Sequence, residues 1–548
     1  MRIRPFRACF KGLMEMFRPL RPMVLLSVVL GIASVAASLG FVWISKRVVD
    51  IATGGTDAPL MPAVWVFIGI ISSQVVLRVA AGYWNGYILV RSQNDSRADV
   101  FEKVMRSTWN GQERLHSGDT VNRLEGDITV ITTFLCENLP EFIVTLVQLV
   151  AAVVFLFKLA PDLAWILIFI MPVAVIGSRL FFKKMRTLTN EIRALDSSVQ
   201  SHMQENLQHR VVVKTLGATS RVLEKLGLLQ KEVKGKTIER LNYGAVARAF
   251  MQVGFAGGYA LAFLWGVFGL KNGTVTYGLM VAFLQLVGQV QRPVADITRH
   301  IPAFIKALTS EDRLLELLEQ PQEDESHPVV IEGAPGIRVD NISFAYDGKL
   351  ENVISALDYD FKPGSMTVIA GPTGIGKSTL IRVIMGLLKP SEGKVTLYGA
   401  DGSSYVSSAD TRCNFMYVPQ GNSLMSGDIR SNLLLAKHDA SEDEMREALH
   451  LAAADFVMDL PEGLDTGCSE IGAGLSEGQA QRIAIARALL RPGGVLVLDE
   501  ATSALDSETE LLLLKNISEH YRGNKTILCI THRPAATAYA DQTLEMSR

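Results

Sequence analysis

A glycine-rich stretch in the second half of the chain has the residue types and the spacing of a phosphate-binding loop. It reads GPTGIGKST, begins at Gly371 and follows the apolar, strand-like run MTVIA. Glycines at Gly371, Gly374 and Gly376 let backbone N–H groups approach bound phosphates without a Cβ in the way. Lys377 would reach the β- and γ-phosphates, and the Ser378 hydroxyl would be a ligand of Mg²⁺. A strand, this loop and a helix start in that order predict a nucleotide site, to which the positive end of the helix dipole contributes.

Two carboxylates end another apolar run further along the chain. The run reads GGVLVLDE and ends in Asp499 and Glu500. A strand that merely ends in acidic residues is common, so the phosphate-binding loop is what gives this pair its meaning. In phosphoryl transfer, Asp499 would hold Mg²⁺ and Glu500 would polarise the attacking water.

The segment LSEGQAQRIAIARALL, between these two motifs, resembles the signature motif of ATP-binding-cassette (ABC) ATPases. Other motifs of that family follow in family order. They are Tyr346 in SFAY, Gln420 in YVPQ, Glu470 in SEIG, Asp506 in SALD and His532 in ITHR. On these motifs the second half of the chain is identified as a member of the ABC family.

The resemblance implies a role for each matching residue. Tyr346 would stack on adenine, Gln420 would contact Mg²⁺ and water, and His532 would link the γ-phosphate to Glu500. The expected catalytic residues are Lys377, Glu500 and His532, and the expected Mg²⁺ ligands are Ser378, Gln420 and Asp499. The expected contacts to ATP are Tyr346, Gly371, Pro372, Thr373, Gly374, Ile375, Gly376, Lys377, Ser378, Thr379, Gln420, Ser476, Gly478, Gln479 and Asp506.

One position departs from the family pattern. Glu477 stands where the signature usually has glycine, whereas Ser476 and Gly478, which face the γ-phosphate in the family, are kept. The helix dipole favours a carboxylate in a first helical turn, but a triphosphate would repel it. We therefore expect Glu477 to face solvent or a basic neighbour.

The elements that must position these residues alternate between strand-like apolar runs and helical patterns. This alternation is typical of an α/β domain with a parallel sheet, and we predict an α/β P-loop NTPase domain here. Three pairs of residues have the spacing of capping boxes and predict helix starts. They are Ser441 with Glu444, Ser476 with Gln479, and Ser507 with Glu510.

Six apolar segments in the first half of the chain could cross a bilayer core of about 30 Å, which takes roughly 20 residues. They cover residues 23–45, 62–86, 139–159, 162–182, 246–270 and 277–297. Long charged stretches follow the second and fourth segments, and basic residues gather before the first and after the fourth. By the positive-inside rule, the amino terminus and both long stretches are cytoplasmic. We predict an all-α membrane domain of six transmembrane helices with long cytoplasmic extensions.

The sequence HSGDTVNRLEGDITVI at 116–131 also resembles the first cytoplasmic loop of ABC exporters. A membrane domain followed by one cassette is the half-transporter layout of that family. The predicted boundaries are 1–307 for the transmembrane domain, 308–336 for a charged, proline-containing linker and 337–548 for the nucleotide-binding domain.

The resemblance implies an ATP-hydrolysing exporter that uses ATP and Mg²⁺ and works only as a dimer. In the family, ATP lies between the phosphate loop of one cassette and the signature of another, and this chain has one of each. A homodimer is the preferred partner arrangement, and a heterodimer with a second half-transporter is the alternative. We expect a multi-pass protein of the bacterial plasma (inner) membrane, with the cassette in the cytoplasm.

Composition argues against a nucleic-acid-binding protein and against a metal or disulfide role of the cysteines. With 54 Lys and Arg against 56 Asp and Glu, the formal charge of −2 gives no bulk case for nucleic-acid binding. The five cysteines form no C-x-x-C pair and have no histidine at metal spacing, so we expect reduced thiols.

Several polar residues lie inside the predicted spans, where they could contact the transported substrate. Gln285, Gln289 and Arg292 share one helix face, and Arg78 lies in the second span. Such residues tend to be functional, but hydrogen bonding between helices and snorkelling of the arginines is the plainer interpretation. A lipid, a peptide and an amphipathic small molecule all remain possible substrates. An ATP-gated channel or regulator is the alternative function, and six spans argue against a soluble DNA-repair or translation ATPase.

Overall fold

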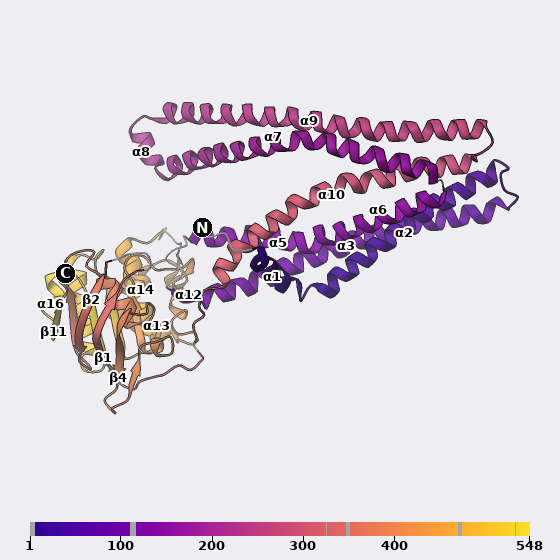
Figure 1. Ribbon diagram of the computed structural model, residues 1–548. Coiled ribbons are helices and arrows are strands. Elements are labelled where there is room, and N and C mark those ends of the chain that lie inside the picture. Colours follow the sequence, from indigo (N-terminus) through magenta and orange to yellow (C-terminus); the bar gives the residue numbers. More distant parts are fainter. Residues whose placement is uncertain are drawn as a thin grey trace. The chain divides into compact units, whose positions relative to one another are not determined.

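The chain forms two compact units in the computed structural model (Figure 1). The helical unit consists of Met1–Phe101 and Val121–Leu317, and the sheet unit of Glu102–Thr120 and Leu318–Arg548. The structure describes residues 6–109, 117–159, 161–324, 326–346, 351–468, 474–531 and 533–547. The domain limits at 307 and 336 remain a prediction.

α-Helices build the helical unit, because only internally bonded backbone is stable where apolar segments meet lipid. They are α1 (Phe6–Phe17), α2 (Arg21–Ala52), α3 (Leu60–Met105), α5 (Ile128–Thr133), α6 (Leu139–Leu159), α7 (Pro161–Gln208), α8 (Arg210–Thr215), α9 (Thr219–Lys271) and α10 (Tyr277–Leu318). The short α4 (Ser117–Asn122) and two π-helical turns, Arg123–Asp127 and Phe134–Asn138, lie on the path into α6.

Four of these helices are long and apolar enough to cross a membrane, by length and composition, within the described residues. They are α2, α3, the continuous helix Thr120–Leu159 and α9. The predicted spans 162–182 and 277–297 lie in α7 and α10. The helical membrane domain is therefore confirmed, and the count of six spans remains a prediction.

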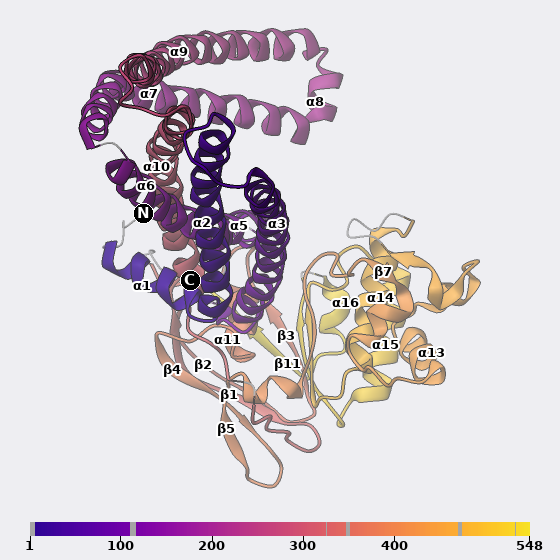
Figure 2. The ribbon, with the colours of Figure 1, turned by 90° about the vertical axis from the view of Figure 1, so that its right-hand side faces the viewer.

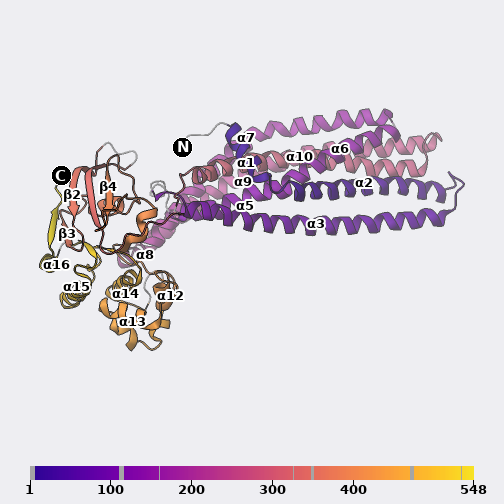
Figure 3. The same cartoon turned by 90° about the horizontal axis from the view of Figure 1, so that it is seen from below.

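The described parts of the charged stretches after the second and fourth apolar segments are mostly helical, as predicted. α3 continues for 46 residues, α7 for 48 and α9 for 53. At 1.5 Å per residue, a helix of such length is roughly 70 to 80 Å long, more than twice the bilayer core. α7 and α9 lie side by side and are joined at one end by α8 (Figures 1 and 2), and α2 lies alongside α3 (Figures 1 and 3).

The sheet unit contains a parallel sheet and an antiparallel sheet. The parallel sheet has the order β11-β3-β10-β9-β6 and the antiparallel sheet the order β2-β1-β4-β5. The strands are β1 (Gly336–Phe344), β2 (Ile354–Phe361), β3 (Met366–Ala370), β4 (Glu392–Tyr398), β5 (Ser404–Val406), β6 (Phe415–Val418), β9 (Val495–Asp499), β10 (Thr526–Ile530) and β11 (Gln542–Glu545), with the short pair β7 (Gly427–Asp428) and β8 (Gly467–Cys468). All residues of β9 and β10 are buried, as expected of central parallel strands.

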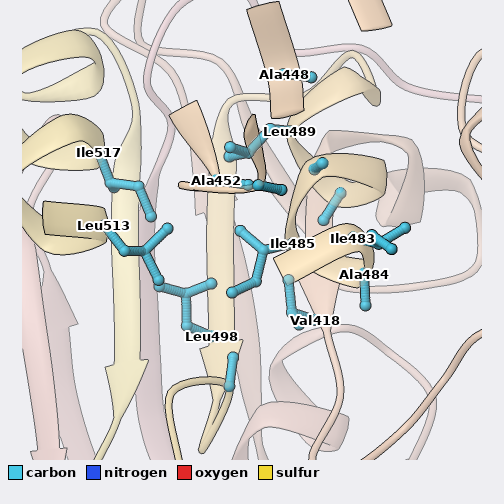
Figure 4. Packing of buried hydrophobic residues seen from close by; sticks show 14 of the residues in the cluster. Val418, Ala448, Ala452, Ile483, Ala484, Ile485, Leu489, Leu498, Leu513 and Ile517 are labelled. Carbon is cyan, nitrogen blue, oxygen red and sulfur yellow. The ribbon is translucent and has the colours of Figure 1, made fainter. Parts of the chain in front are cut away.

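Helices pack on the parallel sheet and enclose the larger core of this unit. They are α12 (Ile429–Leu434), α13 (Glu442–Leu451), α14 (Glu477–Leu490), α15 (Ser507–Tyr521) and α16 (Pro534–Thr537). α11 (Lys377–Ile384) belongs to a second core, which it shares with β1, β2 and β4. Figure 4 shows Ile485 of α14, Leu498 of β9 and Leu513 of α15 meeting in the larger core, where all three side chains are fully buried. The predicted α/β class is confirmed.

Two of the three predicted capping boxes are present, at Ser441 and Ser476. The third prediction is wrong by one residue, because the side chain of Asp506, not Ser507, caps α15. Both residues suit a helix start, and an aspartate caps at least as well as a serine. All five cysteines are free thiols, as expected.

Candidate functional site

The glycine-rich loop joins the end of β3 to the start of α11. Gly371 and Gly376 have φ angles of 149° and 107°, which favour glycine. A Cβ at Gly371 would lie 2.7 Å from the Met546 carbonyl oxygen, and one at Gly376 would lie 2.7 Å from Val353 Cγ1. Close packing on both sides therefore requires glycine, and it leaves the helix N-terminus open to an anion.

The lysine of this loop is held over its backbone. Lys377 is 5% exposed, and its Nζ donates to the carbonyl oxygens of Gly371 at 2.8 Å and Pro372 at 3.1 Å. The side chain thus folds back across the loop. This arrangement suits an ammonium that binds phosphate oxygens.

Two of the expected Mg²⁺ ligands are brought together from distant parts of the sequence. Ser378 Oγ donates to Asp499 Oδ1 at 3.0 Å, and Tyr417 Oη donates to Asp499 Oδ2 at 3.4 Å. Asp499 is 2% exposed, and this burial raises the pKa of its carboxyl group. A hydroxyl and a carboxylate side by side are hard oxygen donors of the kind that Mg²⁺ prefers, so these residues fit the ion.

The expected base is held by the expected Mg²⁺-contacting glutamine. Gln420 Nε2 donates to Glu500 Oε2 at 2.7 Å, which links the end of β6 to the end of β9. Glu500 has a φ of 49°, in the left-handed region that residues other than glycine rarely adopt. Sequence reasoning could not have found this strained backbone, because nothing in the residue types around Glu500 indicates it.

Tyr346 lies beside the same loop. Its hydroxyl is 3.1 Å from Thr379 Oγ1, and its ring meets that of Phe344 edge-on with centroids 4.9 Å apart. Arg382 Nη1 donates to the Tyr346 hydroxyl at 3.5 Å. The ring is thus fixed next to α11, and its stacking on adenine stays a prediction.

The signature residues form the start of α14. Ser476 caps the helix: its Oγ accepts from Gln479 N at 3.2 Å, and Gln479 Oε1 accepts from Ser476 N at 2.8 Å. A Cβ at Gly478 would lie 2.9 Å from the Ala504 carbonyl oxygen, so glycine is needed there. Glu477 is exposed, which agrees with the expectation that it faces solvent.

A network that the sequence did not reveal joins this helix to the loop after β9. The buried Gln481 donates through Nε2 to Ser503 Oγ and accepts from Ala504 N, both at 3.2 Å. Asp506 ends the same loop and accepts from the backbone of Thr509 at 2.9 Å, which lowers the pKa of its carboxyl group. The Asp506 carboxylate therefore caps α15, and its contact with ATP stays a prediction.

Arg533 holds this loop from the other side. Its guanidinium donates to the carbonyl oxygens of Leu505 at 2.8 Å and Ser503 at 3.0 Å. It also pairs with the buried Glu510 at 3.0 Å. Arg533 directly follows His532, which, like Glu470, lies outside the described residues.

Comparison with known proteins agrees with this arrangement. Family models for the ABC transporter transmembrane region and for the ABC transporter match residues 24–294 and 354–503. A fatty acid ABC transporter ATP-binding/permease protein of Mycobacterium bovis is 30% identical over 82% of this chain and 71% of its own length. A putative multidrug export ATP-binding/permease protein of Bacillus subtilis is 26% identical over 98% of this chain and 94% of its own. A bacterial Atm1-family ABC exporter solved with ATP bound shares the fold, with a TM-score of 0.80, 24% identity and coverage of 96% and 94% of the two chains.

Proposed function

The chain belongs to the ABC transporter family as an ATPase coupled to transport across a membrane, and from this premise we propose that it is a homodimeric exporter. ATP hydrolysis in its cassettes drives an amphipathic substrate out of the cytoplasm. The domains are proposed to be 1–307, 308–336 and 337–548. Bacterial relatives of similar length support a place in a bacterial plasma membrane with the cassette in the cytoplasm.

The observation that carries the proposal is the cluster at the ends of β9 and β6. It joins Ser378 to Asp499 and Gln420 to Glu500 next to the glycine-rich loop. Oxygens of Ser378, Asp499 and Gln420 would hold Mg²⁺, which supplies positive charge to the phosphates of ATP. Side chains of this chain bind the nucleotide and activate the attacking water.

Lys377 and the loop N–H groups bind the β- and γ-phosphates, and Tyr346 binds the adenine ring. Glu500, oriented by Gln420, accepts a hydrogen bond from the attacking water and polarises it. His532 contacts the γ-phosphate and connects it to Glu500. The bonds of Lys377 to the loop, of Tyr346 to Thr379 and of Ser378 to Asp499 support these roles, because they gather the side chains at the loop and the start of α11.

A second copy completes each site. Ser476, Gly478 and Gln479 lie at the start of α14, and the two hydrogen bonds between Ser476 and Gln479 are those of the capping box. One chain carries one loop and one signature, so two chains in a two-fold arrangement make two complete sites. Both catalytic halves are present in this sequence, which favours a homodimer over a pair with a different half-transporter.

The test is ATP hydrolysis by the purified protein in lipid vesicles. Glu500→Gln should reduce turnover by at least about a hundredfold, since it removes the group that polarises water. Lys377→Ala should abolish hydrolysis and also weaken ATP binding. Wild-type turnover by Glu500→Gln would overturn the assignment of the base. Passive ion conductance without substrate-stimulated hydrolysis would point instead to an ATP-gated channel.

A further inference from the structure

Two arginines, Arg78 of α3 and Arg292 of α10, lie inside apolar segments of the helical unit. Both are exposed. Within the described part of the chain, neither forms an ion pair. An arginine at this position in a membrane is costly unless it faces water or an anion, so it points to a functional site.

Aromatic residues show how deep Arg78 lies, because tryptophan and tyrosine gather at the two membrane surfaces. Trp65 near the start of α3 is 71% exposed, and Trp84 donates to the Met23 carbonyl oxygen at 3.1 Å. These tryptophans are roughly 28 Å apart along the helix, which matches a bilayer core of about 30 Å. Arg78 lies about 20 Å from Trp65 and about 9 Å from Trp84, well inside the core.

Arg292 lies at the same depth, because α3 and α10 are both bonded to one place on α2. Gln74 Nε2 donates to the Ala37 carbonyl oxygen at 2.9 Å, and Gln289 Nε2 donates to Oγ of the next residue, Ser38, at 2.8 Å. Each arginine follows its glutamine by about one helical turn. The ends of α2 and α10 are also tied, since Asp50 Oδ1 accepts from Gly278 N at 2.9 Å.

Helix direction opposes snorkelling of these two arginines. Cα–Cβ bonds tilt toward the N-terminus of a helix. In the proposed orientation, α3 and α10 both run from the outside inward, so Arg78 and Arg292 are directed toward the middle of the membrane. Arg248 is also exposed, but it lies on α9, which runs outward, and is directed toward the cytoplasm. Arg248 can therefore reach the membrane surface, whereas Arg78 and Arg292 are poorly placed to do so.

The surroundings of Arg78 are apolar. Val75, Val76 and Val79 are 57%, 65% and 67% exposed on the same helix. A cation beside such a surface is suited to a molecule with a charged head and an apolar tail.

We propose that Arg78 and Arg292 bind the head of an anionic amphiphile, a carboxylate or phosphate on a hydrocarbon tail, as the transported substrate. Guanidinium groups bind both kinds of head through paired, charge-assisted hydrogen bonds. The inference rests on the proposed exporter function and names the substrate class for it. Neutral and cationic amphiphiles lack the matching charge.

The test measures ATP hydrolysis by the full chain in phosphatidylcholine vesicles. Sodium myristate and dodecyl phosphate should stimulate turnover, and dodecanol and dodecyltrimethylammonium should not. In R78Q and R292Q the concentration for half-maximal stimulation should rise by about tenfold or more, as expected on losing a charged hydrogen bond. R78K should retain part of the response, because it keeps the positive charge. R248Q is the matched control and should respond like the wild type.

Equal stimulation by all four amphiphiles, or an unchanged response of both R78Q and R292Q, would overturn the substrate class while the Glu500-dependent basal activity remained. Loss of the dimer in R78Q, with the preference for anions intact, would also overturn it, since Arg78 would then pair with the second copy. Vesicles that contain phosphatidylglycerol separate two sources of the same chemistry. Stimulation by that lipid alone supports a membrane lipid as substrate, and stimulation only by added myristate supports a free amphiphile.

Discussion

Glu500 combines a strained backbone with a restrained side chain. Its φ of 49° is held by a bond from Glu500 N to the Ile530 carbonyl oxygen at 3.0 Å, and Gln420 fixes the carboxylate at 2.7 Å. Backbone in this region costs about 1–3 kcal/mol for a residue with a Cβ. The fold of β9 and β10 supplies that energy, and the result is a carboxylate held at the end of β9 by Gln420.

Glu477 should weaken ATP binding through its charge alone. It is exposed in the first turn of α14, next to the Ser476 and Gly478 that would face the triphosphate of the second copy. Glu477→Gln keeps the helix and removes the charge, so the KM for ATP should fall by up to about fivefold, with little change in kcat. The difference should shrink in high salt. Glu508→Gln, in the first turn of α15, is the control, and a KM that fell equally there would argue against a local effect.

Arg533 should matter for both stability and turnover. Arg533→Ala leaves the buried carboxylate of Glu510 without its cationic partner, which should destabilise the sheet unit by about 3 kcal/mol. Adding Glu510→Gln removes the unpaired charge and should restore much of the stability, as measured by thermal unfolding. Turnover should stay low in the double variant, because the carbonyl oxygens of Ser503 and Leu505 still lack their donor. Full recovery of turnover would show that Arg533 serves stability only.

At the scale of the elements, α1 packs on the end of α10 through a glycine and a buried acid. A Cβ at Gly12 would lie 2.3 Å from Glu311 Oε1, so the glycine leaves room for the Glu311 carboxyl group against α1. Glu311 is 1% exposed, and its Oε2 has no hydrogen-bond partner in the described residues. Burial, with a smaller effect of Glu15, raises the pKa of Glu311 from 4.5 to about 7.

This raised pKa predicts a pH dependence of the α1–α10 packing. The folded state holds the proton of Glu311 up to about pH 7 and the unfolded chain only up to about pH 4.5, so folding takes up a proton between these values. The stability from this group is therefore fully present below pH 4.5 and falls as pH rises to about 7. In Glu311→Gln, the unfolding temperature should depend less on pH between about pH 5 and 8. At about pH 8 this variant should unfold at a higher temperature than the wild type. Glu319→Gln is the comparison variant, and an equally flattened profile there would contradict the assignment.

Much of the architecture could be predicted from periodicity and local motifs, and the misses have physical reasons. The order of strand, loop and helix at Gly371 and the strand ending in Asp499 are local patterns, so the sequence contains them. The sequence pattern predicts the cap of α15 one residue late, because Asp506 and Ser507 are both good capping residues. The networks of Gln481 and Arg533 join residues far apart in the chain, and no local pattern encodes such contacts.

For the whole molecule, the division into a helical and a sheet unit matches a division of chemistry. The helical unit carries the exposed arginines, and the sheet unit carries the phosphate loop and the signature. Within the sheet unit, Gln481 bonds the signature helix to the loop after β9. Arg533, the residue that follows His532 in the sequence, bonds the same loop. In a dimer, each chain would contribute its phosphate loop to one ATP site and its signature to the other. The bonds of Gln481 and Arg533 would therefore connect the two sites through a single chain.

Complementation between two inactive variants tests this shared architecture. Lys377→Ala removes the loop lysine and Ser476→Arg blocks the signature, so each homodimer should lack both sites and hydrolyse no ATP. A mixed dimer isolated with two affinity tags holds one doubly altered site and one intact site, and should recover up to about half of the wild-type turnover. The intact site of this mixed dimer lies at the interface, because its loop comes from the Ser476→Arg chain and its signature comes from the Lys377→Ala chain. The mixed dimer could stay as inactive as the two parents, although each parent still dimerises. In that case, either the ATP sites are not shared between chains or hydrolysis needs both ATP sites of a dimer to be intact. A control dimer that pairs a wild-type chain with a Lys377→Ala, Ser476→Arg double variant decides between these, since it can be active only if each site lies within a single chain.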